Sequence, residues 1–185
     1  LIRKFNSVMK EYGVPPEALK PVYGMAEVTL GATIPRIRRK QRTEGVQRQA
    51  FEMDSVALLA SADALPQDIL EWTGCGVPLE GQGMRIADKD GNDLPERHVG
   101  SILLKSASLF SGYLDGDGIV PREGEWYDTG DLGYVVDGEV FITGRNREVI
   151  IKNGRNYAPE RIEELAGSVD GVGRGAAFGI FDSRR

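Results

Sequence analysis

The sequence is poor in the residues that most often carry covalent chemistry, with a single cysteine, Cys75, and a single histidine, His98. One thiol excludes an internal disulfide framework and is typical of a reducing compartment, so we expect a cytoplasmic protein. Because no histidine stands near Cys75 in the sequence, a nucleophilic cysteine–histidine pair is not favoured. We interpret Cys75 as a small packed residue and His98, in the polar stretch "PERHVG", as a solvated side chain.

Long apolar runs and an excess of positive charge are also missing. No run approaches the roughly 18 apolar residues of a membrane span, and no signal-peptide pattern is present, so no transmembrane segment is expected. Lys and Arg number 23 against 28 Asp and Glu, which gives a net charge of −5. This balance disfavours a general nucleic-acid-binding surface, so no nucleic-acid partner is expected.

The overall composition is typical of a globular protein, with 41% hydrophobic and 28% charged residues. A chain of 185 residues suffices for one large domain or one and a fraction. The chain opens on Leu1 and directly on a helix-like pattern. We therefore expect a piece of a longer protein.

The first part of the chain favours helices and loops. Apolar residues at helical spacing over residues 1–12 predict a helix, and Gly13 is placed to end it. The polar and basic segment 31–50 is interpreted as a solvated loop, with a contact to an acidic partner or to lipid headgroups as the alternative. Asp54 is expected to cap the start of a short helix. The basic residues of the segment are Arg36, Arg38, Arg39, Lys40 and Arg42.

From residue 75 onward, short strand-like runs alternate with Gly and Asp turns. Asp137-Gly138 and Asn153-Gly154 are typical two-residue hairpin turns, since both turn positions need positive φ. Pro159 suits the first turn of a helix, and "GAAFGIF" predicts a final buried strand. The expected fold is mixed α/β, followed by antiparallel β and then by the start of a small α+β unit.

The stretch "YDTGDLGYVVDGEVFITGRNRE" holds Asp131 and Arg145 at the two ends of one expected hairpin. A carboxylate beside a glycine can accept two hydrogen bonds from a vicinal diol such as the ribose 2′- and 3′-hydroxyls. A guanidinium at the other end of the hairpin can reach ribose oxygens or a phosphate. A plain salt bridge between the two side chains is the alternative, and the spacing alone favours it.

A second candidate cluster is "VYGMAEVTL". Tyr23 could stack on a purine, and Gly24 would let a ligand approach the backbone closely. Glu27 could hold Mg²⁺ through oxygen while the metal keeps waters for phosphate oxygens. Taken alone, a core tyrosine and a surface glutamate explain this cluster as well.

Three motifs in this order, "YGMAE", "WYDTGDLG" and "GRNREVIIKNGRNYAPERIE", resemble the signatures of the adenylate-forming superfamily. That superfamily includes acyl-CoA synthetases, luciferases, nonribosomal-peptide adenylation domains and fatty acyl-AMP ligases, and the resemblance covers nearly the whole chain. It implies ATP/AMP and Mg²⁺ as ligands, with Tyr23 on adenine and Glu27 as a catalytic and metal-binding residue. Asp131 would bind the ribose hydroxyls, and Arg145, as a catalytic and nucleotide-binding residue, would act on the ribose and phosphate side. The remaining nucleotide-binding positions would be Gly24, Met25 and Ala26.

The same resemblance implies a domain division. Residues 1–146 would form the C-terminal portion of the large adenylate-forming domain, an α/β fold with an antiparallel β-barrel-like part. Residues 147–185 would begin the small α+β C-terminal domain, with a hinge near Arg147. Lys152 and Gly154 would lie in a loop that enters the site during thioester formation, and a surface hairpin explains them equally well.

Further features are similar to the fatty acyl-AMP ligases. Ala26 stands where many relatives have a phosphate-contacting threonine, and the segment between Leu30 and Trp72 is long, like the extra insertion of that subfamily. This resemblance implies ATP-dependent activation of a fatty acid to an acyl-adenylate. The acyl group would then pass to the phosphopantetheine thiol of an acyl carrier protein. An acyl-CoA synthetase using coenzyme A and a non-catalytic nucleotide- or carrier-binding chain remain the alternatives.

Other features of the superfamily are missing from the sequence. No Ser/Thr/Gly-rich phosphate loop precedes the "YGMAE" motif, and no lysine follows Lys152, although the catalytic lysine of the family lies near its C-terminus. The 185-residue chain alone is therefore expected to adenylate nothing. The run "GVGRGAAFG" is not favoured as a dinucleotide loop, because it lacks the strand–loop–helix frame and the glycine spacing.

Overall fold

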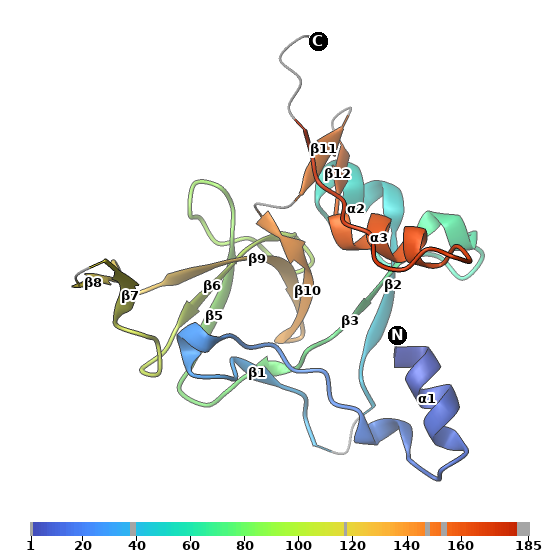
Figure 1. Ribbon diagram of the computed structural model, residues 1–185, viewed down its shortest axis with the longest axis horizontal. Coiled ribbons are helices and arrows are strands. Elements are labelled where there is room, and N and C mark those ends of the chain that lie inside the picture. Colours follow the sequence, from blue (N-terminus) through green and yellow to red (C-terminus); the bar gives the residue numbers. More distant parts are fainter. Residues whose placement is uncertain (1, 38–39, 117, 147–148, 153–154, 181–185) are drawn as a thin grey trace.

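The computed structural model describes residues 2–37, 40–116, 118–146, 149–152 and 155–180 (Figure 1). Its helices are α1 (Ile2–Lys10), α2 (Arg48–Asp54) and α3 (Pro159–Gly167), with the short 3-10 helices η1 (Pro16–Ala18), η2 (Ala26–Val28) and η3 (Pro66–Asp68). Gly13 follows α1 with φ of 72°, and Pro159 opens α3, so both helix predictions are confirmed. No described helix is long and apolar enough to cross a membrane.

The largest sheet has four antiparallel strands in the order β10-β9-β6-β5. The strands are β5 (Gly83–Ala87), β6 (Gly100–Lys105), β9 (Tyr127–Val136) and β10 (Glu139–Arg145). Along β6 the residues alternate between buried and less buried positions, as a half-buried strand requires. Its inward side chains Ile102 and Leu104 pack with Val140 of β10. This sheet is the framework that carries Asp131 and Arg145.

Four pairs of short antiparallel strands surround this sheet within the described residues. They are β1 (Thr33–Ile34) with β4 (Val77–Pro78), β2 (Thr43–Gln47) with β3 (Ile69–Thr73), β7 (Gly112–Asp115) with β8 (Gly118–Pro121), and β11 (Ile150–Lys152) with β12 (Arg155–Tyr157). The β7–β8 hairpin projects from one end of the molecule, while β11 and β12 lie beside α2 and α3 at the other (Figure 1). The fold is therefore mixed α/β with several small antiparallel sheets.

The expected barrel-like part is not a closed barrel. Within the described residues, β5 and β10 are the two edges of an open sheet and do not pair with each other. Closing a barrel requires every strand to pair on both sides with a continuous stagger. The short β1–β4 and β2–β3 pairs form separate sheets instead of extending the ladder.

The turn between β9 and β10 confirms the hairpin prediction. Asp137 and Gly138 have φ of 53° and 75°, so both central residues occupy the left-handed region that a tight hairpin turn requires. The resulting register places Arg145 directly opposite Asp131. The second expected turn, Asn153-Gly154, lies outside the described residues, although β11 and β12 do pair on either side of it.

The interpretation of residues 31–50 as a loop is wrong, because this segment contains β1, β2 and the start of α2. Strand β2 buries Glu44 and Val46 on one face, and it pairs with β3. An inward glutamate hides the alternation of apolar and polar residues that usually reveals a strand. The basic character of the segment therefore obscured a strand whose buried face is itself charged.

Two further predictions are also wrong. Asp54 ends α2 rather than capping the start of a helix, and Ser55 follows it in the left-handed conformation with φ of 56°. The segment "GAAFGIF" was expected as a buried strand, but its described residues 175–180 form no strand. Phe178 and Ile180 are 73% and 80% exposed, so no sheet in the described part of the chain covers them.

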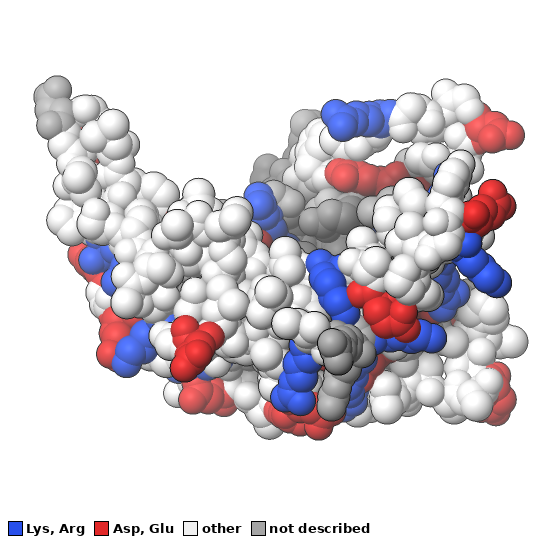
Figure 2. Space-filling view, turned by 90° about the horizontal axis from the view of Figure 1, so that it is seen from below, with Lys and Arg blue, Asp and Glu red and all other residues white. Residues whose placement is uncertain are grey.

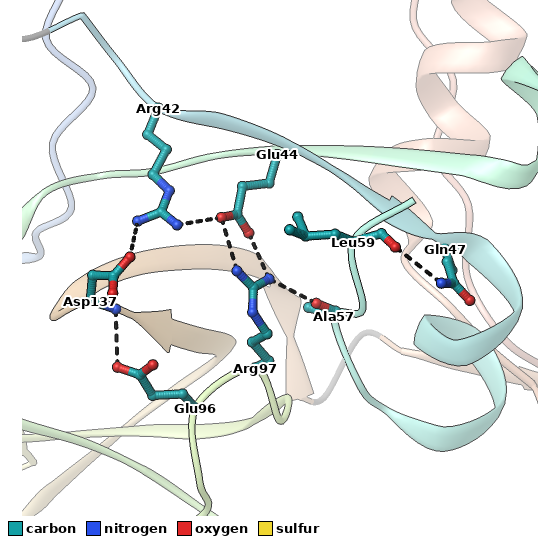
Figure 3. A network of polar contacts seen from close by, with 8 residues as sticks. All are labelled: Arg42, Glu44, Gln47, Ala57, Leu59, Glu96, Arg97 and Asp137. Atoms are coloured by element: carbon teal, nitrogen blue, oxygen red, sulfur yellow. Dashed lines mark hydrogen bonds and ion pairs between the residues drawn. The ribbon is translucent and has the colours of Figure 1, made fainter. Parts of the chain in front are cut away.

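A buried carboxylate, Glu44, organises the region where β2 crosses the β9–β10 turn (Figure 3). Arg42 donates to Glu44 Oε1 over 2.6 Å, and Arg97 donates to Oε2 over 3.1 Å. Arg42 also donates to Asp137 of the hairpin turn over 2.8 Å, while the backbone N–H of Asp137 donates to Glu96. The network thus joins β2, the loop before β6 and the turn that sets the hairpin register.

Positive and negative side chains are also mixed on the molecular surface. Figure 2 shows Lys and Arg side chains interspersed with Asp and Glu on one face of the molecule, rather than collected in a patch of one sign. In the basic segment, Arg42 is neutralised by Glu44 and Asp137, whereas Arg38 and Arg39 lie outside the described residues.

The contrast between two ion pairs on paired strands gives a testable prediction. Replacing Glu44 with Gln leaves Arg42 and Arg97 without their shared buried counter-ion and should lower the free energy of unfolding by about 3 kcal/mol. Replacing Glu71 of β3, which pairs with Arg3 at the surface, should cost less than about 1 kcal/mol. Urea denaturation of both variants checks this, and equal losses would contradict the central role given to Glu44.

Candidate functional site

The candidate site lies where the segment from Tyr23 to Val28 meets β9. Tyr23 is held by an isolated bridge to Thr33, and its backbone carbonyl accepts hydrogen bonds from the N–H groups of Ala32 and Thr33. Its side chain is 7% exposed, and its hydroxyl donates to Asp131 Oδ2 over 2.7 Å. A tyrosine and an aspartate from distant parts of the sequence are thus brought into direct contact.

The protonation state of Tyr23 supports the direction of this hydrogen bond. Burial raises the pKa of the Tyr23 phenol well above its usual range, and the neighbouring Asp131 carboxylate adds to the rise. The phenol therefore stays protonated and acts as a donor at every ordinary pH. The ring packs in the core with Val28, Ile86 and other buried residues, so little of it faces solvent.

An irregularity in β9 presents the Asp131 side chain. Leu132 pairs with Ser101 of β6, and Asp128 pairs with Leu103, so residues 129–131 stand opposite Ile102 alone. Gly130 has φ of 75° within this bulge, which a residue with a side chain adopts less readily. Such bulges redirect side chains out of a regular ladder and often lie next to functional sites.

Arg145 meets Asp131 across the hairpin. Its Nε lies 3.4 Å from Asp131 Oδ1, and the side chains are 66% and 16% exposed respectively. The pairing of the two hairpin ends is confirmed, and the salt bridge weighed as an alternative is present. A surface pair of this kind contributes about 1 kcal/mol or less, so the guanidinium can exchange partners at little cost. The ligand-binding roles stay predictions.

The residues after Tyr23 have distinct environments. Gly24 has no room for a side chain, since a Cβ there would lie 1.8 Å from the carbonyl oxygen of Leu30. A glycine is therefore required at this position by the protein's own backbone, whereas the prediction from the sequence attributed it to the close approach of a ligand. Met25 packs against the core, and exposed Ala26 begins η2.

Glu27 lies in η2 and is tied to the segment before β7. Its backbone carbonyl accepts from the N–H of Phe110 over 2.8 Å, and its Oε1 accepts from the Tyr113 hydroxyl over 3.1 Å. The Tyr113 hydroxyl also lies 2.9 Å from that of Tyr127. Sequence reasoning missed both tyrosines as site residues. Tyr127 lies within the quoted "WYDTGDLG" motif, but nothing in the spacing brings Tyr113 to Glu27.

The donor set around Glu27 is compatible with Mg²⁺ held together with phosphates. The described residues contain no group of three or more His, Cys, Asp or Glu side chains that could form a metal site by themselves. Mg²⁺ commonly uses one or two carboxylates and takes its other ligands from water and substrate phosphates. Glu27, half-buried and with Oε2 receiving no hydrogen bond from the described residues, fits that pattern.

The other predicted positions lie in the C-terminal part or away from the site. Lys152 is the last residue of β11, is exposed and pairs with Arg155, whereas Arg147 and Gly154 lie outside the described residues. Cys75 packs partly buried against the core, and burial raises the pKa of its thiol, which supports its interpretation as a packed residue. His98 is half-buried, with Nδ1 3.1 Å from the Glu96 carbonyl oxygen, rather than fully solvated.

Comparison with known sequences identifies relatives of this chain. Over 175 residues the chain is 39% identical to the Mycobacterium tuberculosis protein Rv1013, which bears a provisional ligase name, covering 92% of this chain and 31% of that protein. Over 176 residues it is 31% identical to the medium-chain-fatty-acid–[acyl-carrier-protein] ligase JamA of Moorena producens, covering 88% and 29%. The chain thus spans about a third of the length of the relatives it matches. No protein-family model matches.

Solved structures share the fold. A structure from studies of fatty acyl-adenylate ligases of E. coli and L. pneumophila superimposes with a TM-score of 0.82 at 29% identity, covering 91% of this chain and 30% of the other. The L. pneumophila fatty acyl-adenylate ligase in complex with acyl adenylate and pyrophosphate gives a TM-score of 0.69 at 27% identity, covering 98% and 33%. The fold is part of an adenylation domain. The chain is a partial-length member of the adenylate-forming superfamily and resembles the fatty acyl-AMP ligases.

The bond between Tyr23 and Asp131 gives a second prediction. Replacing Tyr23 with Phe removes one hydrogen bond to a charged group and should lower the free energy of unfolding by about 1.5 kcal/mol. The loss should be smaller when Asp131 is already Asn, because the two side chains share one interaction. Chemical denaturation of the single and double variants measures this coupling. Tyr12, which is 75% exposed, gives the matched Tyr12→Phe control, and strict additivity would contradict the contact.

Proposed function

We propose that these residues serve, in a protein of the length of its relatives, the ATP-dependent activation of a fatty acid to an acyl-adenylate. The observation that carries this proposal is the meeting of Tyr23, Asp131 and Arg145, three side chains from the motifs that resemble the superfamily signatures. The 31% sequence identity to a medium-chain-fatty-acid–[acyl-carrier-protein] ligase supports a fatty acid as the substrate class.

Asp131 would bind the ribose hydroxyls. Its Oδ2 is held by the Tyr23 hydroxyl, so the carboxylate has a defined orientation before any nucleotide arrives. Arg145 is two-thirds exposed and can turn from Asp131 Oδ1 toward a ribose oxygen or a phosphate. Tyr23 would contact the adenine through the small part of the residue, 7%, that is exposed. Gly24, Met25 and Ala26, which lead into η2, would be the remaining nucleotide-binding positions.

Glu27 would hold Mg²⁺, and the metal, when bound, would neutralise phosphate charge. The chemistry proposed is in-line attack of a fatty-acid carboxylate oxygen on the α-phosphorus of ATP, which forms the acyl–phosphate bond and releases pyrophosphate. Reactions of this kind depend on positioning and charge neutralisation more than on covalent help from the protein. The contribution of the described residues is therefore to orient the nucleotide.

The second step would transfer the acyl group to a thiol. A phosphopantetheine thiolate of an acyl carrier protein attacks the carbonyl carbon of the mixed anhydride, and AMP leaves. We propose that residues 147–185 form the start of a small C-terminal domain that moves about Arg147 between the two steps. In that movement the loop with Lys152 and Gly154 would reach the site.

The first experiment tests which thiol, that of coenzyme A or that of an acyl carrier protein, accepts the acyl group. The protein at the length of its relatives is incubated with ATP, Mg²⁺ and a labelled long-chain fatty acid, and with coenzyme A or a holo acyl carrier protein in separate reactions. We expect acyl-AMP to accumulate with coenzyme A and label to move to the carrier protein. Rapid formation of acyl-CoA would instead identify a conventional acyl-CoA synthetase, and the absence of any acyl-adenylate would overturn the proposed function.

Variants of the two carboxylates separate nucleotide binding from chemistry. Asp131→Ala should weaken ATP binding by about 10- to 100-fold, because it removes charged hydrogen bonds to the ribose. Glu27→Ala should mainly slow adenylation and leave ATP affinity closer to normal. Isothermal titration with ATP and pyrophosphate release measure the two effects, with Asp90→Ala in the exposed 88–92 loop as control. Normal ATP affinity in Asp131→Ala would refute its ribose-binding role.

A further inference from the structure

A directed chain of hydroxyl groups ends on Glu27. The Tyr113 hydroxyl donates to Glu27 Oε1 over 3.1 Å and lies 2.9 Å from the Tyr127 hydroxyl. A phenol has one proton to donate, so while Tyr113 gives its proton to Glu27 it can only accept from Tyr127. The order is therefore Tyr127 to Tyr113 to Glu27.

This hydroxyl chain, from Tyr127 through Tyr113 to Glu27, depends on protonated phenols. Burial raises the pKa of Tyr127 above its usual range, with the Tyr113 hydrogen bond and the Glu27 charge as smaller contributions in the same direction. Tyr127 therefore stays a donor at ordinary pH, and the direction of the chain is fixed.

Packing holds the two rings in place. The ring of Phe110 contacts both tyrosines edge-on, with centroid distances of 4.6 Å to Tyr113 and 5.3 Å to Tyr127. The N–H of Phe110 also donates to the Glu27 carbonyl over 2.8 Å, so the same residue anchors the backbone of η2. Phe110 thus connects the backbone that carries the carboxylate with the phenols that orient it.

The hydroxyl chain lies on the same two segments as the proposed nucleotide site. Tyr127 lies at the start of β9, the strand that also carries Asp131, while Glu27 lies in the segment that begins with Tyr23. The two segments are therefore joined twice through tyrosine hydroxyls: by Tyr23 to Asp131, and by Tyr127 through Tyr113 to Glu27. In both links a phenol donates to a carboxylate that the proposed function uses. Each carboxylate keeps one oxygen for its phenol and has the other to offer a second partner.

We propose that Tyr113 and Tyr127 are positioning residues that hold the Glu27 carboxylate in one orientation through this hydroxyl chain. The proposal rests on the proposed function, in which Glu27 acts during adenylation. With Oε1 held by Tyr113, Oε2 is directed to a ligand without a further loss of side-chain freedom. The tyrosines contact Glu27 and each other, and they act on the reaction through Glu27 alone.

The kinetic test compares three Tyr→Phe variants in the protein at the length of its relatives. Tyr113→Phe should lower kcat for pyrophosphate release about tenfold, as expected for one hydrogen bond to a charged group, with KM for the fatty acid unchanged. Tyr127→Phe should have a smaller effect in the same direction. Tyr12→Phe, in which the lost hydroxyl is in the exposed turn after α1, should leave kcat unchanged. Equal values of kcat for Tyr113→Phe and Tyr12→Phe would overturn the proposal.

A double-mutant cycle separates positioning from general structural damage. If Tyr113 acts through Glu27, Tyr113→Phe should cost nothing further in a Glu27→Gln protein. A second tenfold loss in that background would show that Tyr113 acts elsewhere and would overturn the proposal.

A measurement without turnover distinguishes failure of this proposal from failure of the proposed function. In protein labelled with ¹³C at the tyrosine Cζ, Glu27→Gln should shift the resonances of Tyr113 and Tyr127 but not that of Tyr12. If the unmodified protein forms no acyl-adenylate, the proposed function fails, and these shifts alone decide whether the hydroxyls hold Glu27. Unmoved Tyr113 and Tyr127 resonances would overturn the hydroxyl chain whatever the activity.

Discussion

The register of the β9–β10 hairpin is the constraint on which the candidate site depends. From the Asp137-Gly138 turn, Ile142 pairs with Gly133, and an uninterrupted ladder would then place Gly144 opposite Asp131. The register shifts by one residue between Ile142 and Gly144, so that Arg145 faces Asp131 instead. Because successive residues point to opposite faces of a strand, this single extra residue decides which side chain meets the carboxylate.

The charged side chains around the buried Glu44 hold the other end of the hairpin in place. Asp137 has a left-handed backbone conformation in the turn and accepts from Arg42, which also binds Glu44. Arg97, itself at φ of 67°, completes the pairing of Glu44. The β2 segment, which sequence reasoning assigned to a loop, therefore supports the hairpin that carries the site. It does so through the charge on Glu44, while Val46 of the same strand packs in the hydrophobic core.

The sequence predicted the parts of the fold that depend on local chemistry. The hairpin turn follows from Asp137-Gly138, and α3 from Pro159, because each needs only the backbone preferences of adjacent residues. The strand β2 and the contact of Tyr113 with Glu27 could not be predicted in this way. They depend on which distant segments pair, and the inward glutamate of β2 carries no apolar signal. That the main sheet does not close into a barrel is likewise a property of pairing rather than of any one segment.

If Asp131 binds the ribose as proposed, its internal partners Tyr23 and Arg145 would make that binding an exchange of one set of contacts for another. Its two oxygens already accept from the Tyr23 hydroxyl and face the Arg145 guanidinium. A ribose diol would add to the first contact and displace the second, so the measured affinity is the difference between two sets of bonds. The exposed ion pair costs little to open, whereas the buried phenol stays in place. In the proposed function, this arrangement would keep the carboxylate satisfied and oriented and would still allow a nucleotide product to leave.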